Sequence, residues 1–130
     1  MTATSAVTLR RKTTGQMAHH SGLSAEARIA QDYQRRGFFI VHERWRGEAG
    51  EIDLIARNSD GVVFVEVKKS GSFARAADAL SLRQMQRIYH SAEAYLAEEP
   101  CGQLTNVRFD VALVNGQGEH RIIENAFGHG

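Results

Sequence analysis

A β-hairpin is predicted by residues 51–69, which read EIDLIARNSDGVVFVEVKK. Two runs with strand character, residues 51–57 and 62–69, flank a turn at residues 58–61. The turn reads NSDG, and Asn, Asp and Gly tolerate the positive φ angles that a tight hairpin turn requires. The second run is apolar at nearly every position up to residue 67, which indicates a strand buried on both faces.

The register of this hairpin places acidic side chains together. A loop of two or four residues centred on the turn sets Asp53 opposite Glu66 and Glu51 opposite Lys68, whereas a loop of three or five residues breaks this pairing. Residues that face each other across the strands share one side of the sheet, and alternation brings Lys68 to the side of Glu66. The hairpin therefore predicts one patch that holds three carboxylates and one lysine.

Two opposed carboxylates on a buried strand need a compensating cation, because like charges directly opposite destabilise a hairpin. Lys68 supplies one positive charge, and a divalent ion such as Mg²⁺ or Mn²⁺ matches a set of carboxylate oxygens better. Asp53 and Glu66 are then the expected metal ligands, with Glu26 of the preceding helix as a further ligand. The alternative is a solvated face in which Lys68 forms an ordinary cross-strand ion pair.

The rest of the chain predicts one mixed α/β domain. A helix is expected over about residues 22–36, capped by Ser21 or Ser24 and ended by Gly37. A strand follows from residue 38 towards Trp45. The order αβββαββ is completed by a helix at about 81–98 with a Ser81/Gln84 capping box and by strands at 107–114 and 120–124. Residues 1–20 are read as a disordered basic tail, and residues 21–130 as the domain.

Composition excludes several classes of protein. The chain has 130 residues, a formal net charge of +1 and one cysteine, so no internal disulfide and no cysteine-based zinc site is expected. No run is long and apolar enough to span a membrane, and the N-terminus lacks the apolar stretch of a secretory signal. A cytoplasmic protein without a membrane partner is the expectation.

The hairpin resembles a known nuclease signature. Asp53 followed after twelve residues by Glu66-Val67-Lys68 is similar to the PD-(D/E)XK pattern of the restriction-endonuclease-like superfamily. The surrounding sequence resembles the YraN family over about residues 22–127, through the segments Ala25-Glu26, Gly50 to Ala56, Val63 to Lys68, Ala94-Tyr95-Leu96 and Arg108 to Val111. Two departures are Ile52 at the position of the signature proline and Lys69-Ser70 after the lysine.

The resemblance implies a restriction-endonuclease-like fold, with a mixed central β-sheet flanked by helices, similar to archaeal Holliday-junction resolvases. It also implies catalytic positions at Glu26, Asp53, Glu66 and Lys68. The expected function is Mg²⁺- or Mn²⁺-dependent cleavage of DNA, with branched or structured DNA as the candidate substrate and a homodimer as the candidate assembly. Two alternatives remain: a non-catalytic nucleic-acid-binding module on a nuclease fold, and a protein-docking adaptor in DNA processing.

Basic side chains near the predicted site are candidates for holding the phosphate backbone, since phosphate contacts position a nucleic acid without reading its sequence. Two of them lie four residues apart on the predicted second helix and therefore share one of its faces. A neutral residue on the same helix is a further candidate by resemblance. The full candidate set is Arg44, Arg46, Lys69, Arg75, Arg83, Gln84 and Arg87.

Overall fold

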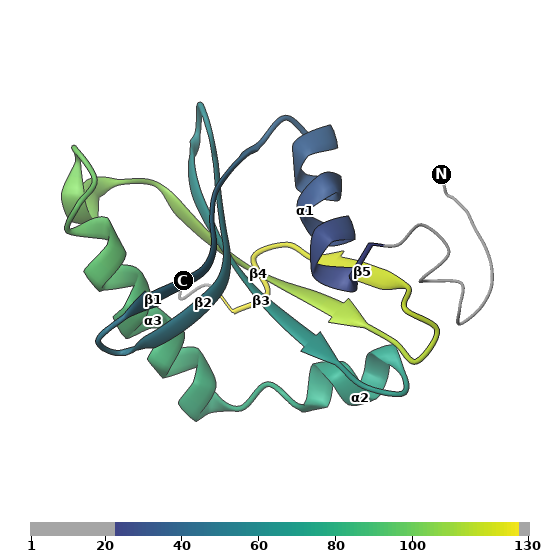
Figure 1. Cartoon of the computed structure of the whole chain (residues 1–130). Helices are drawn as coiled ribbons and strands as arrows, with labels where there is room; N and C mark the ends of the chain where they lie inside the picture. Colours follow the sequence, from purple (N-terminus) through teal and green to yellow (C-terminus); the bar gives the residue numbers. More distant parts are fainter. Residues whose placement is uncertain (1–22, 128–130) are drawn as a thin grey trace.

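The structure, a computed structural model, describes residues 23–127 and contains a five-stranded mixed sheet in the order β1-β2-β3-β4-β5 (Figure 1). The expected order of two main helices and five strands is confirmed, with a short helix α2 and a 3₁₀ turn in addition. The elements are α1 (Ala25–Arg35), β1 (Phe39–Gly47), β2 (Gly50–Asn58), β3 (Gly61–Lys69), α2 (Phe73–Asp78), α3 (Leu82–Leu96), η3 (Gly102–Leu104), β4 (Val107–Val114) and β5 (His120–Ile123).

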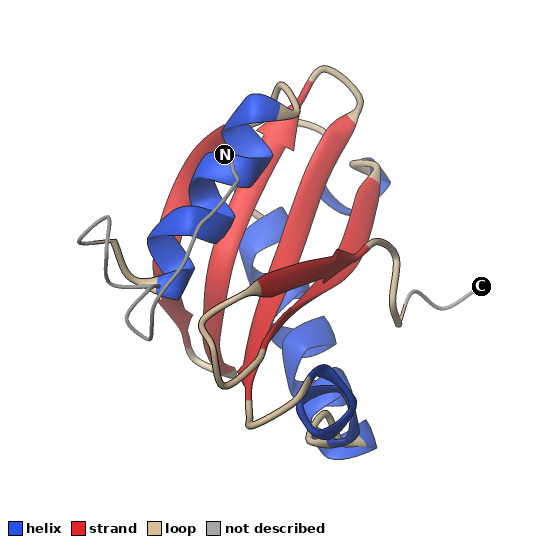
Figure 2. Cartoon of the chain, turned by 90° about the vertical axis from the view of Figure 1, so that its right-hand side faces the viewer, coloured by secondary structure: helices blue, strands red, loops and turns tan. Residues whose placement is uncertain are grey.

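Helices cover both faces of the sheet, as expected of a restriction-endonuclease-like arrangement (Figure 2). On one face α1 buries Ile29 and Tyr33 against the sheet, and on the other α3 buries Ile88 and Tyr95. Each face has its own apolar cluster because side chains alternate along the central strands. The α1 side takes Leu54, Ala56, Val63 and Val65, and the α3 side takes Ile52, Ile55, Val62 and Phe64.

Local signals placed the two main helices correctly. Ser24 caps α1 by accepting a hydrogen bond from the backbone N–H of Ala27, and the chain leaves the helix through Gly37 at φ +94°. At α3, Ser81 and Gln84 form the predicted capping box, each side chain accepting from the backbone N–H of the other. The short helix α2 was not expected; Ser72 caps it, and its Ala76 is fully buried.

The predicted β2–β3 turn and its register are confirmed. Asn58 lies opposite Gly61, and the pairing continues in step to Leu54 opposite Val65. The Asn58 side-chain oxygen accepts hydrogen bonds from the backbone N–H groups of Asp60 and Gly61, which holds the turn closed. From this hairpin β3 runs parallel to β4 along its whole length, which buries residues 62–66 as the apolar run predicted.

The β2–β3 ladder ends at Leu54 and Val65, so the expected continuation to Asp53–Glu66 and Glu51–Lys68 as ladder pairs is wrong. Beyond this point β2 stays paired with β1, while β3 stays paired with β4. The Asp53 carboxylate reaches across the opening and accepts a hydrogen bond of 2.8 Å from the backbone N–H of Val67. The sheet therefore divides at Asp53.

A change of face in the β1–β2 hairpin accompanies this division. Glu43 pairs with Leu54 on the α1 side, whereas Trp45 pairs with Ile52 and packs on the α3 side. Residues two apart in a regular strand share a face, so the strand must turn over at Arg44, which adopts the left-handed conformation at φ +57°. The register puts Arg44 and Asp53 at the same level of the hairpin.

A buried network of hydrogen bonds and an ion pair joins α1 to β4. Asp110 of β4 is fully buried and accepts a 2.6 Å hydrogen bond from the hydroxyl of Tyr33. It also accepts two bonds of 2.9 Å from the guanidinium of Arg108, and one from the backbone N–H of Asn125. Burial and the neighbouring Asp110 raise the pKa of Tyr33, so the phenol stays a proton donor.

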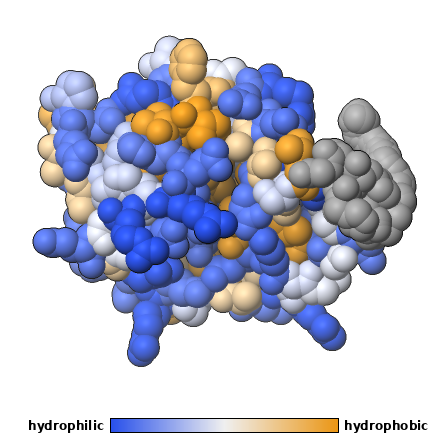
Figure 3. Space-filling model, in the orientation of Figure 1, coloured by the Kyte–Doolittle hydropathy of each residue, from blue (hydrophilic) through white to orange (hydrophobic). Residues whose placement is uncertain are grey.

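The predicted tail, residues 1–20, lies outside the described residues. Within residues 23–127, no helix is long and apolar enough to cross a membrane. The face shown in Figure 3 is mainly hydrophilic, with apolar atoms in small groups. The large apolar side chains that are exposed are spread over five elements, with two of them on β1: Phe39, Val41, Leu82, Leu104, Val107 and Ile123.

Candidate metal and phosphate site

Glu66 is the buried carboxylate of the site. It is 7% exposed near the end of β3, where alternation directs its side chain to the α3 face. Burial raises its pKa to about 7, and the negative charge of Asp53 and a hydrogen bond with Asp53 act in the same direction. The two carboxylates are therefore in contact although their strands no longer pair.

Lys68 lies one strand repeat beyond Glu66 on the same face. Its Nζ is 3.6 Å from Oε2 of Glu66, and its side chain is 15% exposed. The positive charges of Lys68 and Arg87 lower the pKa of Glu66, but burial and Asp53 outweigh them. The predicted grouping of Asp53, Glu66 and Lys68 is present in the structure, and its negative charge is incompletely balanced.

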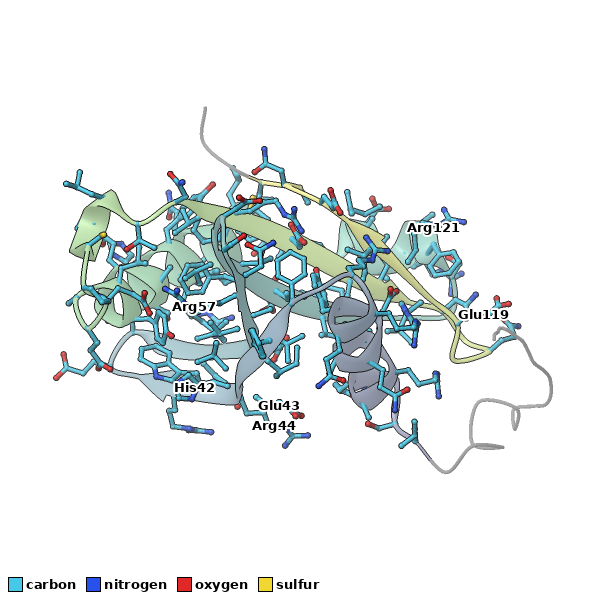
Figure 4. The ribbon with its side chains drawn as sticks, turned by 90° about the horizontal axis from the view of Figure 1, so that it is seen from above. His42, Glu43, Arg44, Arg57, Glu119 and Arg121 are labelled. Atoms are coloured by element: carbon cyan, nitrogen blue, oxygen red, sulfur yellow. The ribbon has the colours of Figure 1, made fainter. Side chains whose placement is uncertain are left out.

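A pocket of about 130 Å³ opens beside Asp53 where β1 and β2 face α1. Glu43 and Arg44 project together from β1 beside α1 (Figure 4). The turnover at Arg44 brings both of these consecutive side chains into the lining, together with Asp53. The complete lining consists of Glu26, Ile29, Glu43, Arg44, Glu51, Asp53, Leu54 and Val67.

Glu26 reaches this pocket from the first turn of α1, as its predicted role requires. It is paired with a lysine, however: Nζ of Lys69 lies 2.7 Å from its Oε2. Burial by itself would raise the pKa of Glu26. The hydrogen bond from Lys69 and the charges of Lys69 and Arg44 lower it by more, so the net shift of the pKa is downward. Glu26 is therefore an anion with a partner already in place.

The other candidate phosphate-binding residues differ in how close they come to the carboxylates. Arg87 lies nearest, since its charge acts on Glu66 and its aliphatic stem packs over Gly50, where a Cβ would be 3.1 Å from Cδ. Gln84 is engaged in the α3 capping box. The remaining three are exposed: Arg46 on β1 opposite Glu51, Arg75 on α2, and Arg83 on α3.

The donor set of this site fits a hard divalent cation in kind. Asp53 and Glu66 provide carboxylate oxygens in contact, and a cation between them would offset the burial and the repulsion from Asp53 that raise the pKa of Glu66. Glu26 supplies a third carboxylate from the pocket wall. Among residues 23–127, no three His, Cys, Asp or Glu side chains are gathered in metal-binding geometry.

Sequence reasoning missed Glu43 and did not foresee that Glu51 faces the pocket instead of Lys68. Both follow from the turnover of the β1–β2 hairpin at Arg44. An arginine gives no local signal for a positive φ, because residues other than Gly, Asn and Asp rarely adopt this backbone conformation. The division of the sheet gave no signal either, since the apolar pattern of both strands continues past it.

Fold and site together define a small mixed α/β protein with an acidic pocket at the division of its sheet. Residues 25–114 match the uncharacterised protein family UPF0102, and the chain belongs to this family. This is the YraN family that the sequence resembles.

Relatives in the same family match over nearly their full lengths. A UPF0102 protein of Ruegeria pomeroyi is 60% identical over 116 residues, which cover 89% of this chain and 94% of the relative. One from Roseobacter denitrificans is 53% identical over 116 residues, with 89% and 90% covered. One from Dinoroseobacter shibae is 44% identical over 115 residues, with 88% and 86% covered.

Proposed function

We propose that this protein is a metal-dependent endonuclease that hydrolyses phosphodiester bonds in DNA, with branched or structured DNA as its substrate. The observation that carries the proposal is the contact of the buried Glu66 with the half-buried Asp53, with Lys68 beside them, at the place where the sheet opens. A carboxylate with a strongly raised pKa, as at Glu66, is typical of functional sites. The similarity to the nuclease signature points to the same three residues.

In this proposal Asp53 and Glu66 hold Mg²⁺ or Mn²⁺, with Glu26 as a further ligand. The bound ion supplies Lewis-acid stabilisation of negative charge on the phosphate. Lys68 places a fixed positive charge beside Glu66, where it stabilises the charge that grows on the phosphoryl oxygens during hydrolysis. Arg44, Arg87 and Lys69 surround the carboxylates and provide cationic contacts for the DNA backbone.

Protonation of Glu66 also limits the pH range in which the site can bind metal. With a pKa of about 7 it retains a proton over much of the neutral range, and a protonated carboxyl is a poor metal ligand. Metal binding must release that proton. Activity at a fixed low metal concentration is therefore expected to rise with pH through the neutral range.

The decisive experiment compares the wild type with Asp53→Asn on linear, flapped and four-way-junction DNA, in Mg²⁺, Mn²⁺ or EDTA. Asparagine can still accept the hydrogen bond from Val67, so the substitution removes charge and keeps the local geometry. Cleavage should require metal and be lost in D53N. Asp78→Asn, which changes an exposed carboxylate on α2, serves as the matched control.

Metal binding is measured separately from cleavage. Mn²⁺ should raise the melting temperature of the wild type and of D78N, because a ligand that binds only the folded state stabilises it. The shift should be absent in D53N. An equal shift in all three proteins would show that the metal site is elsewhere.

The alternative function, a non-catalytic nucleic-acid-binding module, predicts a different outcome. DNA would then bind without being cut in any metal, and binding would survive the loss of Asp53. The homodimer implied by the resemblance is tested on the same samples, since a two-fold assembly places two copies on one four-way junction. Light scattering of the complex distinguishes two copies from one.

A further inference from the structure

The Glu26–Lys69 ion pair places a cation of the protein on a carboxylate of the proposed metal site. Lys69 ends β3 and its side chain is 55% exposed, while Glu26 is 35% exposed on α1. The 2.7 Å contact joins the end of β3 to the first turn of α1. The charge of Arg44, which also lines the pocket, acts on Glu26 as well.

Lys69 is distinct from its neighbour Lys68 in what it can do. Alternation along β3 directs Lys68 towards Glu66 on the α3 face and Lys69 towards Glu26 on the α1 face. Lys68 therefore belongs with the buried Glu66, whereas Lys69 is more exposed and can change partner. A phosphate group entering the pocket offers Lys69 an anion that competes with Glu26.

We propose that Lys69 couples the two occupants of this site: in the free protein it holds Glu26, and a DNA phosphate that takes Lys69 releases Glu26 to the divalent ion. The inference rests on the proposed function, because it assigns a regulatory role to a residue of the same site. The metal then competes with Lys69 for Glu26, and the phosphate competes with Glu26 for Lys69. Each therefore makes the binding of the other more favourable.

Such coupling is reciprocal by thermodynamic necessity, so DNA must raise metal affinity by the factor by which metal raises DNA affinity. Removing Lys69 should break the link in a specific way. Glu26 would lose the cation that is hydrogen-bonded to it, so the metal would bind the free variant more tightly than it binds the free wild type. DNA would then add little to metal affinity, although it would lose one cationic contact.

The test is calorimetric titration of Mn²⁺ into wild type and Lys69→Gln, each with and without a phosphorothioate duplex that resists hydrolysis. Gel analysis of the same samples verifies that the duplex is intact. In the wild type the duplex should raise Mn²⁺ affinity by about fivefold or more, the lower range of ordinary allosteric coupling. In K69Q, Mn²⁺ should bind the free protein several-fold more tightly, and the effect of the duplex should fall to roughly twofold or less.

Two further variants complete the design. Arg35→Gln removes an exposed cation of α1 that is 3.9 Å from its partner, and it should behave as the wild type. Lys69→Arg keeps the charge and should restore coupling. Wild-type behaviour of K69Q, either in its Mn²⁺ affinity or in the effect of the duplex, would overturn the inference.

Failure of the inference is distinguishable from failure of the proposed function. If D53N loses Mn²⁺ binding while K69Q behaves as the wild type, the metal site stands and Lys69 has no coupling role. If D53N binds Mn²⁺ as the wild type does, or if the wild type binds none, the proposed metal site itself is wrong and the inference falls with it.

Discussion

At the scale of single residues, burial and neighbouring charges give two similar carboxylates of the site different pKa values. Glu66 and Glu26 are both carboxylates of the candidate site, yet the pKa of Glu66 is raised and that of Glu26 is lowered. Burial acts upward on both. The difference comes from the depth of burial and from the neighbours, since Glu66 is deeply buried and faces the negative Asp53, whereas Glu26 is more exposed and faces the cation of Lys69.

Lys68→Ala should reduce catalysis far more than binding. Its charge acts mainly on the transition state in the proposed mechanism, so the cleavage rate should fall by about 100-fold or more. DNA affinity should lose at most roughly one phosphate contact's share of the salt dependence. Single-turnover cleavage and fluorescence anisotropy measure the two effects. Equal cleavage rates for wild type and K68A would remove Lys68 from the mechanism.

Glu66→Gln should change how stability depends on pH in the absence of metal. The pKa of Glu66 is about 7 in the folded protein and 4.5 in the reference state, so the folded state binds the extra proton between these values. The wild type should therefore lose stability as pH rises through this window. The loss relative to E66Q should be on the order of 3 kcal/mol between pH 5 and 8.

Urea unfolding in EDTA at both pH values measures this difference. Glu48→Gln, at an exposed position of the β1–β2 turn, is the control and should show the pH dependence of the wild type. If the wild type and E66Q respond to pH alike, the pKa of Glu66 is not raised in solution, and Glu66 is neither buried nor in contact with Asp53 as the structure has it.

At the scale of elements, the site lies where the β1–β2 hairpin separates from the parallel β3–β4 pair. The β2–β3 turn holds the two strands in register as far as Leu54 and Val65, and the β1–β2 hairpin then turns away. Trp45 packs edge-on against Tyr95 of α3, with ring centroids 5.5 Å apart, and this contact anchors the diverging hairpin to the helix. The opening that contains Asp53 is thus fixed at both ends.

Gly61→Ala should destabilise the β2–β3 turn. Gly61 has φ +152°, and an added Cβ would collide with the backbone carbonyl oxygen of Asn106, which accepts the hydrogen bond of Val62. Steric overlap and backbone strain together should cost on the order of 3 kcal/mol of unfolding free energy. Chemical denaturation measures the loss.

Gly102→Ala is the matched substitution, because Gly102 also has a positive φ, +53°, but no atom lies within 4 Å of an added Cβ. It should cost about 1 kcal/mol, from backbone strain alone. A G61A protein as stable as G102A would mean that the segment around Asn106 moves freely.

At the scale of the whole molecule, buried polar contacts join parts of the chain that are distant in sequence. Asp110 links α1 through Tyr33, β4 through Arg108 and the segment after β5 through Asn125. This network lies on the α1 side of the sheet, and Asp110 does not line the pocket. The Arg108 to Val111 segment of the family resemblance therefore contains a structural carboxylate.

Asp110→Ala should be strongly destabilising, by about 3 to 5 kcal/mol, because it leaves Arg108 and the Tyr33 hydroxyl without their buried partner. Tyr33→Phe removes one hydrogen bond and should cost about 1 to 2 kcal/mol. Equilibrium unfolding measures both. Because the network supports the fold and not the site, Mn²⁺ binding by folded Y33F should equal that of the wild type, and its loss would give Tyr33 a role in the site.

The sequence by itself determined the elements whose causes are local. The NSDG turn and its register, the caps at Ser24 and Ser81, and the buried strand ending near Glu66 depend on residues a few positions apart, and all are present in the structure. The tertiary structure alone decided that β2 leaves β3 at Asp53, that Arg44 turns over, and that Lys69 pairs with Glu26. These features arise where hairpin, sheet and helix pack together. They depend on contacts between segments distant in the chain, and such contacts produce no periodic pattern in the sequence.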